Sequence, residues 1–445
     1  MSDQMIRARL DASPMSSFQW SAIGICVLLN VLDGFDVLVM SFTASGVSRE
    51  WQLSSAALGL LLSAGLAGMA AGSLFLAPLA DRFGRRALIL GCLALSSGGM
   101  FLSAASQSAV QLGLTRVLTG IGIGGILAAS NVIAAEYANA RWRGLAVSLN
   151  STGYAVGATL GGIVAAVLQG TAGWRAVFLF GAVATALLIG AVLWRLPESL
   201  DFLLVRRSPG ALARLNKLLA SMKQPPLDTL PDAPAPVRPS AGVAQLLSPA
   251  LRRNTLLSWL SFFLVMFGFY FVTSWTPKLL VDAGLSATQG ITGGVLLNLG
   301  GIFGTALLGL LASRFPLKHV LTGYAVVTAV LLSVFVPATG TLALAFGVGL
   351  LIGLFVNGCM AGLYALTPSI YPAPVRDTGV GWGIGIGRMG AILSPVVAGW
   401  LLDASWTPGA VYLLVAVFLL LGGAAVRAVR LRPATAAPAV AERGR

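Results

Sequence analysis

The chain is 445 residues long, 57% of them hydrophobic and only 10% charged, and its mean hydropathy is +0.86. Soluble globular proteins carry about 25% charged residues, so this composition excludes a soluble globular fold. A net charge of +14 is compatible with nucleic-acid binding by its size alone, so the positions of the basic residues have to decide what it means.

The sequence divides into successive apolar segments of about 20 residues, the length that crosses a bilayer as an α-helix. The expected spans are 19–43, 55–79, 87–105, 110–135, 145–168, 174–194, 255–276, 288–312, 318–337, 342–367, 378–402 and 409–429. These runs are continuous and do not alternate, which excludes a membrane β-barrel. The sequence therefore predicts an all-α polytopic membrane protein with twelve transmembrane helices.

The basic residues are distributed unevenly between the two ends of the spans. Most Lys and Arg fall in segments that share one side if the N-terminus lies inside, whereas Arg49, Arg175 and Lys278 fall on the other side. Because cytoplasmic loops carry an excess of Lys and Arg, we expect both termini in the cytoplasm. The positive charge is thus explained by topology, and no nucleic-acid partner is expected.

Six spans precede a polar, partly proline-rich segment that is expected to be extended in part, and six follow it. The predicted division is a cytoplasmic N-terminal tail at 1–18, an N-terminal six-helix bundle at 19–195, a cytoplasmic linker at 196–254, a C-terminal six-helix bundle at 255–430 and a cytoplasmic C-terminal tail at 431–445. Residues 68–86 and 300–318 match at a constant offset, which pairs Arg82 with Arg314. Such repeats indicate alternating access to a site between two pseudo-symmetric bundles, or a duplication that only packs.

Cysteine and histidine give no sign of a metal site. Cys26, Cys92 and Cys359 lie inside apolar spans, where they fit packing better than disulfide formation. His319 is the only histidine, and no metal-ligand pattern surrounds it. Because no nucleophile–base pair stands out either, the sequence predicts neither an enzyme nor a bound metal or cofactor.

Two carboxylates occupy the first span. Asp33 and Asp36 lie three residues apart, so they share a helix face with Asn30. Ionisable residues inside the membrane are costly and mark functional sites, and neighbouring carboxylates oppose each other's ionisation. The pair is expected to take up a proton on one side and release it on the other. The alternative is that one aspartate only holds the helix by hydrogen bonds.

Two arginines also lie within spans. Arg388 and Asp33 both lie near the middle of the membrane, because an α-helix rises about 1.5 Å per residue. A guanidinium at that depth needs an anion, either Asp33 in a permanent ion pair or the carboxylate of a substrate. Arg116 lies at a depth compatible with a pair to Asp36, and this geometry leaves coupling and packing both open.

Five aromatic residues of the spans are further candidates for a binding site. They are Phe35, Tyr270, Trp275, Tyr364 and Trp382. Together with Asn30, Asp33 and Arg388, they would line a cavity that accepts an aromatic ring. The alternative is that they face lipid or the protein core, as aromatic residues of membrane helices more often do.

Several motifs resemble those of a known family. Ala77–Arg86, APLADRFGRR, resembles the major facilitator signature of the loop after the second helix, with alanine where that pattern has glycine. Leu112–Gly125, LGLTRVLTGIGIGG, and Pro197–Ser199, PES, are similar to further patterns of that superfamily. Asp33–Asp36, DGFD, and Gly379–Ile392, GVGWGIGIGRMGAI, resemble motifs of its aromatic acid:proton symporter family. The resemblance covers the spans and is absent from the linker and tails.

This resemblance implies a major facilitator fold and a secondary active transporter in the bacterial cytoplasmic membrane. It implies proton-coupled import of a small carboxylate, aromatic or derived from an aromatic compound, with Asp33, Asp36 and Arg116 in proton coupling and Arg388 at the substrate. The expected partners are the organic anion, protons and the lipid bilayer, and the chain is expected to act as a monomer. The alternative is a proton-driven exporter or drug antiporter of the same fold.

The resemblance also implies a gate at the cytoplasmic end of the first bundle. The implied gating residues are Asp81, Arg82, Arg85, Arg86, Glu136 and Arg143. In this interpretation Asp81 latches onto the other bundle and favours the outward-open state, and Glu136 joins the cluster. Charges in a cytoplasmic turn are also ordinary, so a solvated loop that only sets the topology is the alternative.

Overall fold

The computed structural model describes residues 3–206, 210–230 and 243–430. Within these residues every regular element is helical, and 12 helices are long and apolar enough to cross a membrane. The predicted all-α polytopic membrane fold with twelve spans is therefore confirmed. The C-terminal tail, 431–445, and the proline-rich part of the linker, 231–242, lie outside the described residues.

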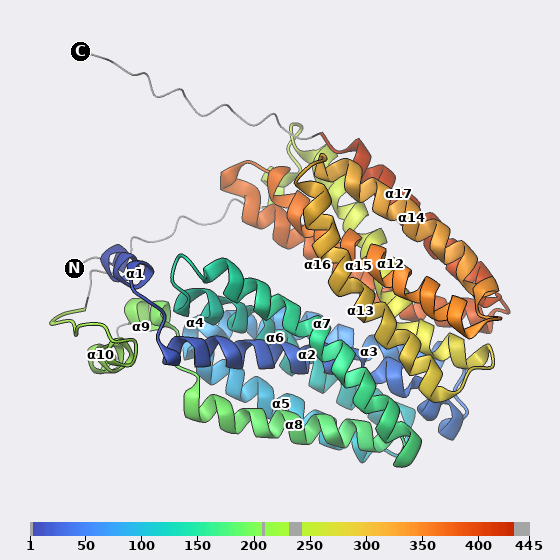
Figure 1. Ribbon diagram of the computed structural model, residues 1–445, viewed down its shortest axis with the longest axis horizontal. Helices are drawn as coiled ribbons and strands as arrows, with labels where there is room; N and C mark the ends of the chain where they lie inside the picture. The colour runs from blue at the N-terminus through green and yellow to red at the C-terminus, as the bar shows by residue number, and fades with distance from the viewer. Residues whose placement is uncertain (1–2, 207–209, 231–242, 431–445) are drawn as a thin grey trace.

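The first six spans form one bundle (Figure 1). They are α2 (Ser17–Trp51), α3 (Ser55–Phe75), α5 (Arg85–Ala104), α6 (Ala109–Tyr137), α7 (Arg143–Thr171) and α8 (Trp174–Arg195), with η1 (Ala77–Leu79) and α4 (Ala80–Phe83) between α3 and α5. Serine side chains cap the starts of three of these helices, because Ser16, Ser54 and Ser108 each accept a hydrogen bond from an N–H of the first turn. At α2 the side chain of Gln19 completes a capping box.

The last six spans form the second bundle beside the first (Figure 1). They are α12 (Arg252–Asp282), α13 (Ala287–Ala312), α14 (Leu317–Ala338), α15 (Leu342–Leu366), α16 (Arg376–Asp403) and α17 (Pro408–Ala428), with η2 (Thr367–Ser369) and η3 (Ala373–Val375) between α15 and α16. Ser286 with Gln289 forms the capping box of α13, and Thr407 caps α17. Polar side-chain caps therefore start some of the helices in each bundle.

Short helices outside the spans lie at the end of the bundles where the described chain begins and ends, which we call the terminal face (Figure 1). They are α1 (Asp3–Ala12), α9 (Leu200–Arg206), α10 (Ala211–Ser221) and α11 (Val243–Leu246). Ile6 and Leu10 of α1 are buried in one cluster with Leu200 and Leu204 of α9. Apolar contacts therefore fold parts of the segments that the sequence identifies only as a tail and a linker.

Glycine lets α2 and α7 cross at close range. A Cβ on Gly34 would lie 1.9 Å from the main-chain oxygen of Tyr154, and a Cβ on Gly157 would lie 1.8 Å from that of Val31. Small residues at membrane helix crossings allow the backbones to approach in this way. The crossing brings Tyr154 next to the part of α2 that carries Asp33.

Replacing Gly157 by alanine is expected to lower the thermal stability of the purified protein, because the new methyl group overlaps the backbone of α2. Overpacking of this kind costs about 1–3 kcal/mol. Gly170→Ala in the same helix is the matched control, since a Cβ there has no atom within 4 Å. Equal melting midpoints for the two variants in detergent would contradict the close crossing.

Candidate functional site

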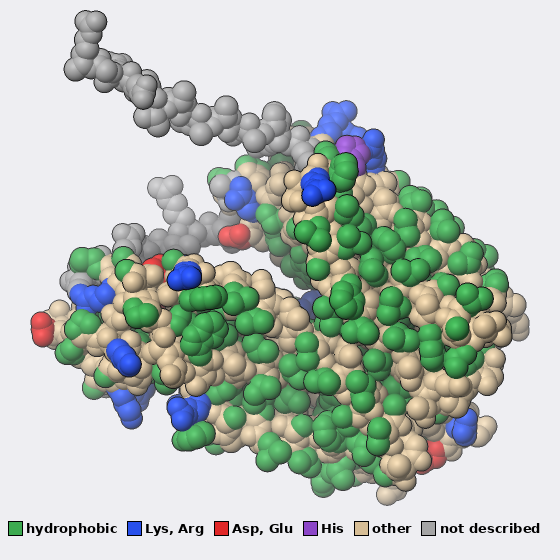
Figure 2. Space-filling model, viewed as in Figure 1, with side chains coloured by type: hydrophobic (Ala, Val, Ile, Leu, Met, Phe, Trp, Pro, Cys, Tyr) green, Lys and Arg blue, Asp and Glu red, His purple; other side chains and the backbone are tan. Residues whose placement is uncertain are grey.

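The two bundles meet at one end and part at the other. Figure 2 shows a hollow between them that opens toward the terminal face. Farther from that face, the hydroxyl of Ser41 in α2 donates to the main-chain oxygens of Thr273 (2.9 Å) and Ser274 (2.8 Å) in α12. Ser63 of α3 donates to the main-chain oxygen of Ile392 (2.6 Å) in α16. The molecule is therefore open at the terminal face and closed at the opposite end.

Asp403, the last residue of α16, helps to close that opposite end. Its carboxylate oxygens accept hydrogen bonds from the main-chain N–H groups of Ser55 (2.8 Å) and Ala56 (2.9 Å) at the start of α3. A carboxylate is stabilised there by the unpaired N–H groups and by the helix dipole. Asp403 of one bundle thus caps a helix of the other, and this contact has to break when the end opens.

Asp403→Ala is therefore expected to shift the protein toward conformations that open opposite the terminal face. Loss of a helix cap costs about 1 kcal/mol, which changes a population about fivefold. Val295 faces Gly162 across the closed interface. We would replace Val295 by cysteine and measure the rate at which this cysteine is alkylated. The rate is expected to be about fivefold higher when Asp403→Ala is also present. Asp282→Ala, at an exposed carboxylate of α12, is the control. Unchanged alkylation in the Asp403 variant would contradict the role of this cap.

A cavity of ≈ 340 Å³ lies between the bundles. Helices α2, α3, α6 and α7 line it from one bundle, and α12, α13, α15 and α16 from the other. Its polar lining residues are Asn30, Asp33, Asn131, Ser151, Tyr154, Tyr270, Thr305, Asn357, Tyr364 and Arg388. A largely apolar cavity of this size with a few polar groups is typical of sites that bind small molecules.

Asp33 lines this cavity from α2 with only 7% of its surface exposed. Its Oδ1 atom is buried and accepts no hydrogen bond from the described residues. Burying an ionised carboxylate without a donor is costly. Asp33 therefore needs a proton, or a donor from a bound molecule, to complete its hydrogen bonding.

Arg388 lines the same cavity from α16 and reaches across to the other bundle. Its Nη1 donates to the hydroxyl of Ser73 (3.0 Å) and to the main-chain oxygen of Met69 (3.3 Å) in α3. Among the described residues it forms no ion pair, so the permanent pair with Asp33 that the sequence left open is not observed. The remaining donors of the guanidinium are available to an anion in the cavity.

Asp36 and Arg116 form the ion pair between the first and fourth spans that their depths predict. Nη1 of Arg116 lies 2.7 Å from Oδ1 of Asp36, and Nη2 donates to the main-chain oxygen of Asp36 at 2.8 Å. The ring of Phe178 packs against the guanidinium. Both charged residues are buried, and neither is among the residues that line the cavity.

Three of the five aromatic candidates lie away from the cavity. Phe35 is buried in the core, and the indole N–H of Trp275 donates to the main-chain oxygen of Pro395 (3.2 Å). Trp382 is 43% exposed and packs beside Trp259. The expectation that Phe35, Trp275 and Trp382 line the cavity is corrected, because core packing and the outer surface account for them.

The other two candidates, Tyr270 and Tyr364, do line the cavity, together with residues that sequence reasoning missed. Those residues include Tyr154, Asn131 and Asn357, which lie in apolar spans. A polar side chain in such a span is the signal that would have singled them out. However, the span pattern alone does not tell which helix face points toward the second bundle.

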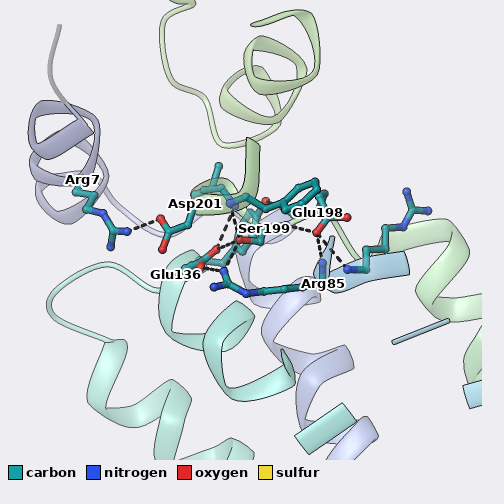
Figure 3. Close-up of polar contacts among 10 residues, drawn as sticks. Arg7, Arg85, Glu136, Glu198, Ser199 and Asp201 are labelled. Carbon is teal, nitrogen blue, oxygen red and sulfur yellow. Dashed lines mark hydrogen bonds and ion pairs between the residues drawn. The ribbon is translucent and has the colours of Figure 1, made fainter. Parts of the chain in front are cut away.

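A network of charged and polar groups, the terminal cluster, joins α5 and α6 to the segment after α8 (Figure 3). Its members are Arg85, Glu136, Glu198 and Ser199. Arg85 pairs with Glu136 and donates to the hydroxyl of Ser199. Oε1 of Glu198 accepts from the main-chain N–H groups of Arg85 (2.8 Å) and Arg86 (3.1 Å). Glu136 therefore joins the expected cluster through Arg85.

Helix α1 is tied to the same region. Arg7 pairs with Asp201 beside the terminal cluster (Figure 3), and Arg143 at the start of α7 pairs with Asp11 (2.5 Å). Arg143 is therefore held against α1 at the terminal face.

The side chains of the other expected gating residues make different contacts. The guanidinium of Arg86 donates to the main-chain oxygen of Leu193 (2.6 Å), and that of Arg82 stacks on Phe83. Asp81 is exposed, and among the described residues its carboxylate forms no hydrogen bond or ion pair with the other bundle. A latch from Asp81 to the second bundle is thus not engaged in this open conformation.

Known proteins match almost the whole chain. The pattern of the Major Facilitator Superfamily matches residues 26–348 and 299–445. The gallate transporter of Pseudomonas putida is 34% identical over 400 residues, which are 88% of this chain and 87% of that protein. The 4-hydroxybenzoate transporter PcaK of Pseudomonas aeruginosa is 32% identical over 90% of each chain. The 3-(3-hydroxy-phenyl)propionate transporter of Escherichia coli is 31% identical over 92% of this chain and 96% of that protein.

Solved structures share the fold. A bacterial homolog of the human lysosomal transporter Spinster, inward-facing and occupied, matches with a TM-score of 0.72 and 19% identity over 93% of this chain and 97% of its own. The inward open xylose transporter XylE from E. coli matches with a TM-score of 0.71 and 19% identity over 92% and 96%. The chain therefore belongs to the major facilitator superfamily, as a multi-pass membrane transporter related to the superfamily's transporters of aromatic acids.

Proposed function

We propose that this transporter imports a small aromatic carboxylate together with protons across the bacterial cytoplasmic membrane. The cavity between the bundles carries the proposal, because it holds both Asp33 and Arg388. Within the described residues, Oδ1 of Asp33 has no donor and the guanidinium of Arg388 has no carboxylate partner. The first group suits a proton, and the second suits a carboxylate because a guanidinium presents paired donors. The names of the gallate and 4-hydroxybenzoate relatives support an aromatic acid as the substrate.

In this proposal a proton binds Asp33 from outside, the substrate carboxylate binds Arg388, and the bundles then rock so that the cavity opens inward. A monoanion and one proton thus cross together without net charge. The rings of Tyr154, Tyr270 and Tyr364 flank the substrate, and Asn30 contributes a polar contact. The ion pair of Asp36 and Arg116 is assigned to proton coupling.

The terminal face is the cytoplasmic face in this proposal, because its loops are rich in Lys and Arg. Both termini are then cytoplasmic, and the conformation described above is inward-open. The residues assigned to gating lie at this face: Asp81, Arg82, Arg85, Arg86, Glu136 and Arg143. The bundles of 19–195 and 255–430 move as two bodies, within a single chain that acts as a monomer.

Uptake into proteoliposomes with an imposed pH gradient tests the proposal. Labelled benzoate, 4-hydroxybenzoate, protocatechuate and muconate are supplied outside, and protein-free vesicles correct for passive entry of the neutral acids. We expect uptake of at least one aromatic acid that depends on the protein and collapses when a protonophore is added. Indifference of every substrate to the protonophore would end the symport proposal, and expulsion of the acid against the gradient would indicate an exporter.

A further inference from the structure

Three asparagines from three helices form a hydrogen-bonded chain beside the cavity. Nδ2 of Asn30 in α2 donates to Oδ1 of Asn150 in α7 (2.8 Å), and Nδ2 of Asn150 donates to Oδ1 of Asn131 in α6 (2.7 Å). Asn30 and Asn131 line the cavity, whereas Asn150 is fully buried behind them. Asn150 therefore orients two residues of the cavity without lining it.

Main-chain carbonyl groups at both ends fix the direction of this chain. The oxygen and nitrogen of an amide side chain are assigned by their partners, and a carbonyl group accepts but never donates. At one end Nδ2 of Asn131 donates to the oxygen of Leu127 (3.1 Å), which leaves its Oδ1 for Asn150. At the other end Nδ2 of Asn30 donates to the oxygen of Cys26 (3.2 Å) as well as to Asn150. Turning any one amide around would bring like groups together.

This fixed direction leaves Asn30 with an acceptor only. Its Nδ2 donates to the main-chain oxygen of Cys26, to Oδ1 of Asn150 and to the hydroxyl of Ser130 (3.2 Å). Both N–H groups of the amide are therefore occupied, and neither remains to donate to a ligand. Its Oδ1 accepts no hydrogen bond within the described part of the chain, and Asn30 lines the cavity. The free oxygen suits a hydroxyl group of a ligand, which donates, and not an ether, which only accepts.

We propose that Oδ1 of Asn30, held by Asn150, selects aromatic acids that carry a hydroxyl group on the ring. This inference rests on the proposed function, since it concerns the same cavity. The ring hydroxyl donates to Asn30 of one bundle while Arg388 of the other bundle holds the carboxylate. A site built to bond a hydroxyl rejects an analogue that lacks it, because the buried acceptor is then left unpaired. Asn150 is accordingly a positioning residue for substrate selection.

The test compares kcat/KM for 3-hydroxybenzoate and 4-hydroxybenzoate with that for benzoate and 4-methoxybenzoate in proteoliposomes. The wild-type protein is expected to prefer one hydroxybenzoate by about tenfold, the effect of one buried hydrogen bond. Asn150→Leu is expected to reduce this preference to about one while benzoate uptake stays within about twofold of wild type. Asn30→Ala removes the acceptor itself and is expected to lose the same preference, so it tests the assignment even if Asn150→Leu does not fold.

Asn298→Leu is the matched control, because Asn298 is also buried in a span and does not line the cavity. Among the residues that the structure describes, its amide donates only to Gly294 of its own helix. It is expected to keep the wild-type preference. An equal loss of benzoate and hydroxybenzoate uptake in both test variants would overturn the assignment, as would a wild-type protein without any preference. A wild-type protein that transports no aromatic acid would instead remove the proposed function itself.

Discussion

Asp33→Asn is expected to abolish proton-driven accumulation of the substrate while leaving exchange of labelled for unlabelled substrate intact. An amide resembles the protonated carboxyl group in shape but neither binds nor releases a proton at neutral pH. With one proton per anion, a gradient of one pH unit supports about tenfold accumulation, since one unit corresponds to about 1.36 kcal/mol. In the variant we expect the accumulation ratio to fall to about one.

Counterflow separates this effect from damage to the protein. Vesicles loaded with unlabelled substrate, without a pH gradient, should still take up label through the Asp33 variant, because exchange requires rocking of the bundles but no net proton movement. Asp282→Asn is the control, because this carboxylate lies at the exposed end of α12 beside Lys278. Full proton-driven accumulation by Asp33→Asn would exclude Asp33 as the proton carrier.

The fold was predictable because the bilayer restricts the chain so strongly. Lipid offers no hydrogen bonds, so each apolar segment of about 20 residues has to be a helix. Because these helices rise regularly, the depth of a residue in the membrane is also predictable. Asp36 and Arg116 lie on different spans at depths that are compatible with a contact, and they form an ion pair. Depth also placed Asp33 and Arg388 at similar levels, and both line the cavity.

The direction of each side chain around its helix was not predictable in the same way. In a span that is apolar on all sides, no periodic pattern marks the face toward the second bundle. The sequence therefore gives no reason to separate Trp275 and Trp382 from Tyr270, although Tyr270 alone of these three lines the cavity. The position of Asn150 behind the cavity could not be predicted from the sequence for a related reason. It depends on hydrogen bonds that join three helices.

Arg116→Met is expected to destabilise the protein strongly, because it leaves the Asp36 carboxylate without its charged partner. Asp36 is 3% exposed and Arg116 is 2% exposed, so water does not replace the lost partner. Removing one member of a buried ion pair costs about 3–5 kcal/mol, whereas replacing both members by apolar residues is often neutral. Melting in detergent should therefore show a large loss for Arg116→Met and a recovery for Asp36→Leu combined with Arg116→Met. Lys278→Met is the control, because its pair with the exposed Asp282 is worth about 0–1 kcal/mol.

The double variant also decides between packing and coupling for this pair. If Asp36 and Arg116 only hold α2 against α6, a protein that regains its melting temperature should regain proton-driven accumulation as well. If they couple the proton to the movement of the bundles, the double variant should be stable and should exchange substrate, yet fail to accumulate it. We expect the second result, because Asp36 lies only three residues from Asp33 along α2. The carboxylates of Asp33 and Asp36 also adjoin one small internal space. A change of charge at Asp36 then alters the electrostatic potential at Asp33, because the protein interior between them screens charge only weakly.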